Sequence, residues 1–255
     1  MRSAIVFQNL KTAIEFLTIF KLGKSTEEIN REYFANSIMF FPLVGLFLGG
    51  FCASAEILLK DLVASDVARS LFAVIILALF TRGLHLDGVA DCFDALHFAG
   101  DDREKALEVM KGKTIGVFGA SALILVIVGK LIAISAIPEG IRIESLLLIP
   151  ALSRWTSSIV ARERAPASAE GLGYIFSVYT TRKAFLISGV IALALSFLLL
   201  GIKGIVIFVF VSILALFLTS FFNRSFGGIT GDVFGAVIEL SEVFGFLLGG
   251  IVIGS

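Results

Sequence analysis

Long apolar segments follow one another along this chain, and they limit the folds that are open to it. A helix needs roughly 20 apolar residues to cross ~30 Å of hydrocarbon. With 57% hydrophobic and only 16% charged residues, the chain has more apolar surface than a soluble fold could bury. The sequence therefore predicts an all-α polytopic transmembrane helical bundle of about seven spans. The expected spans are 33–55, 70–81 extended by 62–69, 114–137, 145–161, 184–202, 204–223 and 233–255.

The N-terminal segment, residues 4–20, has a different composition. It mixes Gln8, Asn9, Lys11 and Glu15 with an apolar stripe, which favours an interfacial amphipathic helix. An eighth span is the alternative interpretation. Because no repeat and no shift in composition marks a second unit, we expect residues 1–255 to form a single integral membrane domain.

The distribution of basic residues predicts the orientation. If the N-terminus is cytoplasmic, the cytoplasmic segments hold 15 of the 21 Lys and Arg residues, the other side holds 4, and 2 lie within spans. Cytoplasmic loops of membrane proteins carry such an excess. The long loops 82–113 and 162–183 are therefore expected at the cytoplasmic face of the cell membrane. Since the net charge is zero, nucleic acid is not an expected partner.

The densest polar segment runs from Arg82 to Asp94. Asp87, Asp91 and Asp94 are spaced i, i+4, i+7, so on a helix they fall within an arc of about 60°. Carboxylates crowded on one face suit Mg²⁺ or Mn²⁺, held together with substrate phosphates. The alternative is a solvated acidic face. Gly88 removes a side chain there, which we expect to let a substrate approach the backbone.

A second polar cluster lies between the last two spans. Gly227, Gly228 and Gly231 predict a flexible turn, and Asp232 then opens the final helix. An acid there also suits the helix dipole, which is the alternative role of Asp232. Glu239 lies seven residues further on and shares a face with Asp232, and an ionisable group inside a span is a functional candidate.

Basic residues near these clusters are candidates for binding phosphate. Arg154 lies in mid-span, so we expect it to face the bundle interior and pair with an acid or an anionic ligand. Backbone N–H groups at Gly116–Gly119 open a helix and are predicted to hold phosphate. Membrane anchoring is the alternative role of the basic residues at the cytoplasmic ends. The predicted substrate-binding residues are Arg82, Lys111, Arg154, Arg162, Arg224 and Gly231.

Four stretches resemble one family in their order along nearly the whole chain. They are Arg82 to Ala95, Met110-Lys111 to Gly119, Glu170-Gly-Leu-Gly173, and Arg224 to Ala236 followed by Glu239. The chain resembles the cobalamin synthase family, whose members are adenosylcobinamide-GDP ribazoletransferases. The resemblance implies that a cobinamide phosphate is transferred to α-ribazole or its 5′-phosphate, that GMP is released, and that Mg²⁺ is required.

This chemistry agrees with the carboxylate clusters, because transfer at a pyrophosphate needs the charge of the leaving phosphate neutralised. The predicted metal ligands are Asp87, Asp91, Asp94, Asp232 and Glu239, and the predicted catalytic residues are Asp94, Asp91 and His85. For His85 only its place in the motif supports a role. Two rival functions remain open: a membrane phosphotransferase acting on a CDP-alcohol or lipid, and a solute or cation transporter. A homo-oligomer is also left open.

Overall fold

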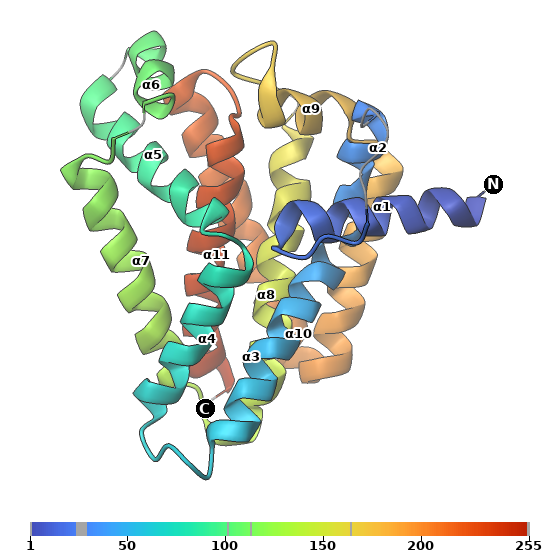
Figure 1. The fold of residues 1–255 in the computed structure, drawn as a ribbon, viewed down its shortest axis with the longest axis vertical. Coiled ribbons are helices and arrows are strands. Elements are labelled where there is room, and N and C mark those ends of the chain that lie inside the picture. The colour runs from blue at the N-terminus through green and yellow to red at the C-terminus, as the bar shows by residue number, and fades with distance from the viewer. Residues whose placement is uncertain (1, 24–29, 101, 113, 164, 254–255) are drawn as a thin grey trace.

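The computed structural model describes residues 2–23, 30–100, 102–112, 114–163 and 165–253. Every regular element in these ranges is a helix, which confirms the all-α prediction. The helices form a bundle whose upper end carries α2, α6 and α9, while the chain ends at the lower end (Figure 1). The elements are α1 (Arg2–Leu17), α2 (Arg31–Asn36), the 3₁₀ helix η1 (Ser37–Phe40), α3 (Phe41–Leu59), α4 (Asp66–Phe80), α5 (Leu84–Ala99), α6 (Arg103–Met110), α7 (Val117–Ser135), α8 (Glu139–Arg162), α9 (Gly171–Tyr179), α10 (Arg182–Phe226) and α11 (Gly231–Ile253).

Four helical stretches in the described residues are long and apolar enough to cross a membrane, or five if the bent pair α4–α5 is one span. The four are Arg31–Leu59, Val117–Ser135, Arg182–Phe226 and Gly231–Ile251. The chain is therefore an all-α membrane bundle. The count of five is lower than the expected seven for two reasons. The helix α8 carries several charged residues, and α10 joins two of the expected spans into one helix. The number of spans stays a prediction.

The 45-residue helix α10 reverses direction at Gly201, where φ is 59°. Trp155 of α8 packs against both Phe185 and Phe208, with ring centroids 5.3 and 5.9 Å away. Those two residues are 23 positions apart, which a straight helix would separate by about 35 Å. The two segments predicted as spans 184–202 and 204–223 are thus the two limbs of one helical hairpin, and α8 lies against both.

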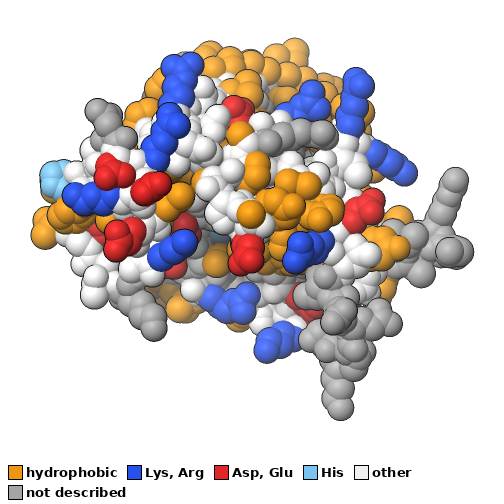
Figure 2. Space-filling view, turned by 90° about the horizontal axis from the view of Figure 1, so that it is seen from above, with side chains coloured by type: hydrophobic (Ala, Val, Ile, Leu, Met, Phe, Trp, Pro, Cys, Tyr) orange, Lys and Arg blue, Asp and Glu red, His pale blue; other side chains and the backbone are white. Residues whose placement is uncertain are grey.

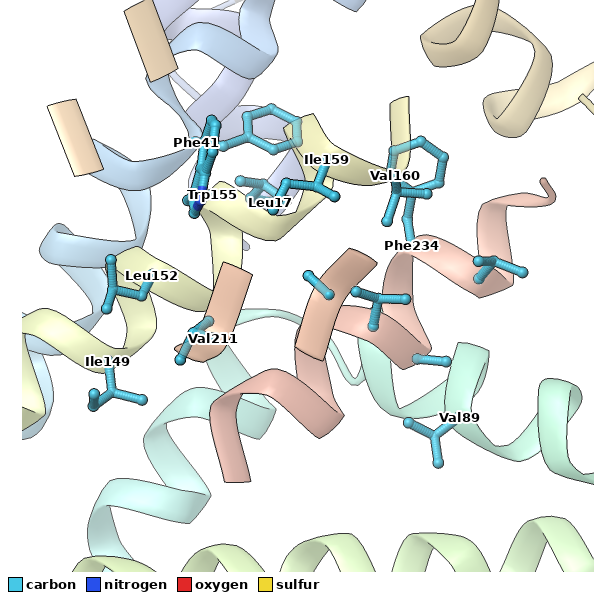
Figure 3. Close-up of a cluster of buried hydrophobic side chains, with 14 of the residues drawn as sticks. Leu17, Phe41, Val89, Ile149, Leu152, Trp155, Ile159, Val160, Val211 and Phe234 are labelled. Carbon is cyan, nitrogen blue, oxygen red and sulfur yellow. The ribbon is translucent and has the colours of Figure 1, made fainter. Parts of the chain in front are cut away.

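The helix α8 lies at the centre of the bundle and buries nearly every residue of its second half. Leu152, Trp155 and Ile159 project from it into a core that also receives Val211 of α10 and Phe234 of α11 (Figure 3). Around this core, α7 and the limbs of α10 turn large apolar side chains outward. Such exposed apolar surface is what a lipid-facing bundle requires.

The first helix, α1, lies crosswise to the bundle, below α2 and α9 (Figure 1). Ala13 and Leu17 are buried against the other helices, whereas Phe7 is 67% exposed. A helix of 16 residues in this position has the arrangement expected of an interfacial amphipathic helix.

A sharp break separates α4 from α5 and turns the chain by 87°. Arg82 and Gly83 both adopt left-handed backbone conformations there, with φ of 57° and 66°. Only glycine takes this conformation without steric cost, and Arg82 is the single described non-glycine residue with a positive φ. The break sends α5 obliquely across the upper part of α11 (Figure 1).

Candidate active site

The helices α5 and α11 cross with their backbones in contact. A Cβ atom added to Gly88 would lie 2.6 Å from the carbonyl oxygen of Asp232, and one added to Gly235 would lie 3.0 Å from that of His85. We expected Gly88 to admit a substrate to the backbone. The structure corrects this, because the first turn of α11 occupies that space. The two glycines therefore bring the Asp motif of α5 against Asp232.

This crossing gathers three acidic side chains: Asp87, which is exposed, and Asp91 and Asp232, which are half-buried. We call them the acidic cluster. The negative charge of Asp91 is repelled by those of Asp232 and Asp87. None of the ion pairs in the described part of the chain involves any of the three. The acidic cluster is thus an uncompensated concentration of negative charge.

Asp94, predicted to ligate a metal and to act in catalysis, faces a different partner. Its carboxylate accepts hydrogen bonds from the backbone N–H groups of Gly116 (2.6 Å) and Gly119 (2.7 Å), and the side chain is only 4% exposed. The start of α7 was predicted to hold a phosphate with these N–H groups. The structure places the carboxylate of Asp94 there instead. A side chain on either glycine would overlap this carboxylate, which explains the spacing Gly116-Val-Phe-Gly119.

Glu239 and Arg154 lie deeper, in a second group of charges that we call the buried ion cluster: Lys130, Arg154, Glu239 and Glu242. The Lys130 ammonium is 2.7 Å from Glu239 and 2.5 Å from Glu242, and Arg154 pairs with Glu242. Arg154 is fully buried and pairs with an acid, as predicted. It is therefore not placed to meet a phosphate from solution. Glu239, predicted as a metal ligand, has Lys130 as its partner.

Sequence reasoning missed Lys130 and Glu242 as members of this cluster. A signal was present, because each is an ionisable residue inside an apolar span, on α7 and α11 respectively. Two bases and two acids lie in three predicted spans, and this equal number of opposite charges was the signal for mutual neutralisation.

Three hollows border the acidic cluster, each through Asp87, Asp232 or both. One, of about 720 Å³ with its mouth included, is lined by Arg82 and Asp87. Another, of about 510 Å³, is lined by Lys111, Gly231 and Asp232. The third, of about 540 Å³, is mostly apolar and is lined by both Asp87 and Asp232. Three predicted substrate-binding residues, Arg82, Lys111 and Gly231, therefore border the acidic cluster.

The remaining predicted site residues lie elsewhere. Arg162 is exposed and stacks over the ring of Phe185, 5.2 Å from its centroid, and it lines none of these three hollows. Arg224 is exposed on the last turn of α10. His85 is buried, and neither ring nitrogen has a hydrogen-bond partner within the described part of the chain.

The upper end closes around the site through paired loops. Ile229 exchanges backbone hydrogen bonds with Ala165 and Ala167, and Gly173 packs against the backbone of Ile229 and Thr230. The motif Glu170-Gly-Leu-Gly173 is thus held beside the turn that precedes Asp232. From above, charged side chains of both signs surround a hydrophobic patch on this end (Figure 2).

Comparison with known proteins identifies the family. The model of the cobalamin-5-phosphate synthase family matches residues 9–250. The chain belongs to the cobalamin-5-phosphate synthase family. The predicted resemblance is confirmed, and the family match includes the acidic cluster, all three hollows and the buried ion cluster.

Several curated relatives share the same name, adenosylcobinamide-GDP ribazoletransferase. The protein of Clostridium acetobutylicum is 32% identical over 93% of this chain and 94% of the relative. That of Escherichia coli K12 is 34% identical over 88% and 90%, and that of Caldanaerobacter subterraneus subsp. tengcongensis is 31% identical over 82% and 84%. No solved structure matched the chain.

Proposed function

We propose that this protein is an adenosylcobinamide-GDP ribazoletransferase, which transfers the cobinamide phosphate to α-ribazole or its 5′-phosphate and releases GMP. The name shared by the relatives supports this proposal. The observation that carries it is the uncompensated acidic cluster, which three hollows border through Asp87 and Asp232. A reaction that joins two substrates and expels a nucleotide needs room for three groups around one centre.

The acidic cluster fits a divalent cation in its donor chemistry. Among the described residues no three His, Cys, Asp or Glu side chains converge closely enough to hold an ion by themselves. Mg²⁺ usually takes only one or two carboxylates and completes its shell with water and substrate phosphates. We therefore assign Asp87, Asp91 and Asp232 as the residues that would hold Mg²⁺, or Mn²⁺. When bound, the ion supplies neutralisation of the pyrophosphate charge.

The transfer step follows from the chemistry of a pyrophosphate. A ribose hydroxyl of the acceptor attacks the phosphorus that bears cobinamide, a new P–O bond forms, and the P–O bond to GMP breaks. GMP leaves with the electron pair, and the hydroxyl proton passes to a carboxylate. Asp91 is our choice for that base, because burial, followed by the negative charges of Asp232 and Asp87, raises the pKa of its carboxyl group to about 7.

In this proposal Asp94, Glu239 and Arg154 do not contact the substrates, and they act by positioning the helices. Asp94 fixes the start of α7 beside α5 through Gly116 and Gly119. Glu239 and Arg154 hold α7, α8 and α11 together through Lys130 and Glu242. They are positioning residues, whereas Arg82 and Lys111 bring positive charge to the hollows that border the acidic cluster.

We propose that the site faces the cytoplasm. The predicted cytoplasmic loops form α5, α6 and α9, which meet at the upper end of the bundle (Figure 1). In a variant without Cys52 and Cys92, both of which are buried, single cysteines at Asp102 and Ser168 should react with impermeant reagents only from the cytoplasmic side. A cysteine at Gly140 should react only from outside. Labelling of position 102 from outside in intact cells would show that the orientation is the opposite of the one proposed.

One assay tests the proposed activity. Detergent-purified protein is mixed with adenosylcobinamide-GDP, α-ribazole and Mg²⁺, and the released nucleotide is identified. We expect GMP in equal amount to the new cobalamin. Release of CMP from a CDP-alcohol would instead identify a lipid phosphotransferase, and release of neither nucleotide would favour a transporter.

A further inference from the structure

The apolar hollow beside the acidic cluster has an aromatic wall. Phe16 of α1, Phe41 of α3, Phe176 of α9 and Phe234 of α11 line it, and we call it the aromatic pocket. The ring of Phe176 lies 5.7 Å from Phe16, 5.8 Å from Phe41 and 5.3 Å from Phe234, measured between centroids. Phe41 and Phe234 are labelled in Figure 3 near the second half of α8. The hollow takes in about 540 Å³ when the open space at its mouth is included.

The charges around the aromatic pocket exclude phosphate from it. None of the described residues that line it is Lys or Arg, whereas two acids, Asp87 and Asp232, are part of the lining. Without the divalent ion that these two carboxylates would hold, an anionic group is repelled there, and none of the described lining side chains supplies a positive charge to it. The occupant is therefore an uncharged, largely apolar group, and the phosphates of the substrates lie outside, toward Arg82 or Lys111.

Two buried polar side chains in the wall have no partner. The hydroxyl of Ser157 and both ring nitrogens of His85 make no hydrogen bond to any described residue, although the residues are only 1% and 3% exposed. Buried polar groups are nearly always hydrogen-bonded, and leaving one unpaired destabilises the fold. A purely hydrocarbon occupant would leave them unpaired. A flat ring with a polar atom at its edge would satisfy one of them while its faces contact phenylalanine.

The position of the aromatic pocket determines where the rest of such a ligand lies. Asp87 and Asp232 belong both to its lining and to the acidic cluster. A base seated among the phenylalanines therefore leaves an attached ribose at the carboxylates, where its hydroxyl meets the phosphorus under attack.

We infer that the aromatic pocket binds the flat heteroaromatic base of the acceptor riboside, and that Ser157 or His85 donates a hydrogen bond to the ring nitrogen of that base. The inference rests on the proposed transferase function. It adds a binding subsite made by four phenylalanines and two unpartnered polar side chains, all from elements around the upper part of α8.

A chemical substitution in the ligand tests the hydrogen bond. Binding of α-ribazole, and of an analogue with indole in place of benzimidazole, is measured by equilibrium dialysis on the full chain in detergent. Since one neutral hydrogen bond is lost, the Kd for α-ribazole should rise about three- to tenfold in Ser157→Ala or in His85→Phe. The indole analogue lacks the acceptor nitrogen, so its Kd should not change in that variant. Ser158→Ala is the matched control, because Ser158 is equally buried but bonds to Ser188.

A second pair of variants tests the aromatic wall. Phe16→Leu keeps apolar volume but removes a ring face, so the Kd for both ribosides should rise at least about fivefold. Phe20→Leu is its control, since Phe20 lies four residues away and packs on Phe47, Phe51 and Phe80 instead. The KM for adenosylcobinamide-GDP should be the same in both variants.

The outcomes separate the two proposals. If wild-type protein releases no GMP, the transferase function fails. If it does release GMP but neither polar variant, nor the two combined, discriminates between the ribosides, the assignment of the aromatic pocket is overturned. A Phe16→Leu variant that changes only the KM for adenosylcobinamide-GDP also overturns it. If the pocket variants lose binding of a lysolipid while their Kd for α-ribazole stays unchanged, the pocket is an acyl-chain site instead.

Discussion

The acidic cluster and the buried ion cluster share α11 but differ in charge balance. Asp232 belongs to the first and Glu239 to the second, seven residues and about 10 Å further along the helix. The buried ion cluster pairs two bases with two acids at 2.7 Å or less, and none of the four side chains is more than 4% exposed. The acidic cluster has three acids that pair with no base among the described residues, and it borders the hollows of the upper end.

This difference shows that position among partners, and not residue type, decides what a charge in this bundle does. A buried carboxylate that is already neutralised serves the fold, because separating the pair leaves an uncompensated charge. A group of carboxylates without a cation is costly to the fold and is explained by a ligand that brings positive charge. The comparison assigns stability to one cluster and chemistry to the other.

The largest expected effect comes from removing the acid at the centre of the buried ion cluster. Glu242→Gln leaves Lys130 and Arg154 with one carboxylate between them, so the free energy of unfolding should fall by about 3–5 kcal/mol. Thermal denaturation in detergent measures this. Glu239→Gln should lose less, because Glu239 has one basic partner and Glu242 has two. Equal melting of Glu242→Gln and wild type would show that the ion pairs contribute nothing.

The next effect separates chemistry from stability. Asp87→Asn, Asp91→Asn or Asp232→Asn removes charge from the acidic cluster while keeping the shape of the side chain. GMP release should fall at least about a hundredfold, or ~2.7 kcal/mol, with no loss of thermal stability in EDTA. Glu108→Gln, on the exposed surface of α6, is the control that keeps full activity. Near-normal turnover by Asp91→Asn would reduce the acidic cluster to a solvated face.

Asp94 should behave as an intermediate case. An Asn side chain can accept only one of the two N–H bonds from Gly116 and Gly119, so Asp94→Asn loses a charge-assisted hydrogen bond worth about 1.5–3 kcal/mol. Activity and melting temperature should therefore fall together, and KM should rise along with the loss in kcat. A loss of kcat alone, with KM and melting temperature unchanged, would show that Asp94 is a catalytic residue.

The smallest effect is the response of the unreacted protein to metal. Mg²⁺ at ten times its Kd should stabilise wild-type protein by about 1.4 kcal/mol. This gain should vanish in Asp91→Asn but persist in Glu239→Gln, because Glu239 already has Lys130 as its partner. Melting curves with Mg²⁺ and with EDTA supply the measurement. Persistence of the gain in Asp91→Asn would move the metal site away from the acidic cluster.

Much of the fold followed from apolar length alone. The charge-free segments 184–202 and 204–223 predicted the two limbs of α10, since Gly201 to Gly204 lie where apolar character is interrupted. The bend after α4 did not follow, because it depends on a left-handed Arg82 that local propensity opposes. The helical spacing of Asp87 and Asp91 correctly grouped them on one face.

The partners of the deeper acids could not be predicted in the same way. Asp94 shares the face of Asp87, yet its partners lie 22 and 25 residues away in the chain, and only the packing of α7 on α5 brings them together. Glu239 shares a face with Asp232, but two turns of helix carry that face from the hollows into the bundle interior. Sequence periodicity shows on which face of a helix a side chain lies, but it does not show which other element packs against that face.

The hairpin of α10 places a natural optical reporter inside the bundle. Trp155 is the single tryptophan of the chain, and its indole N–H donates to Ser212 on one limb while its ring contacts Phe185 on the other. Any separation of the limbs would expose this indole to lipid or water and shift its emission. The fluorescence spectrum of the unmodified protein therefore reads out the closure of α10 around α8 without a label.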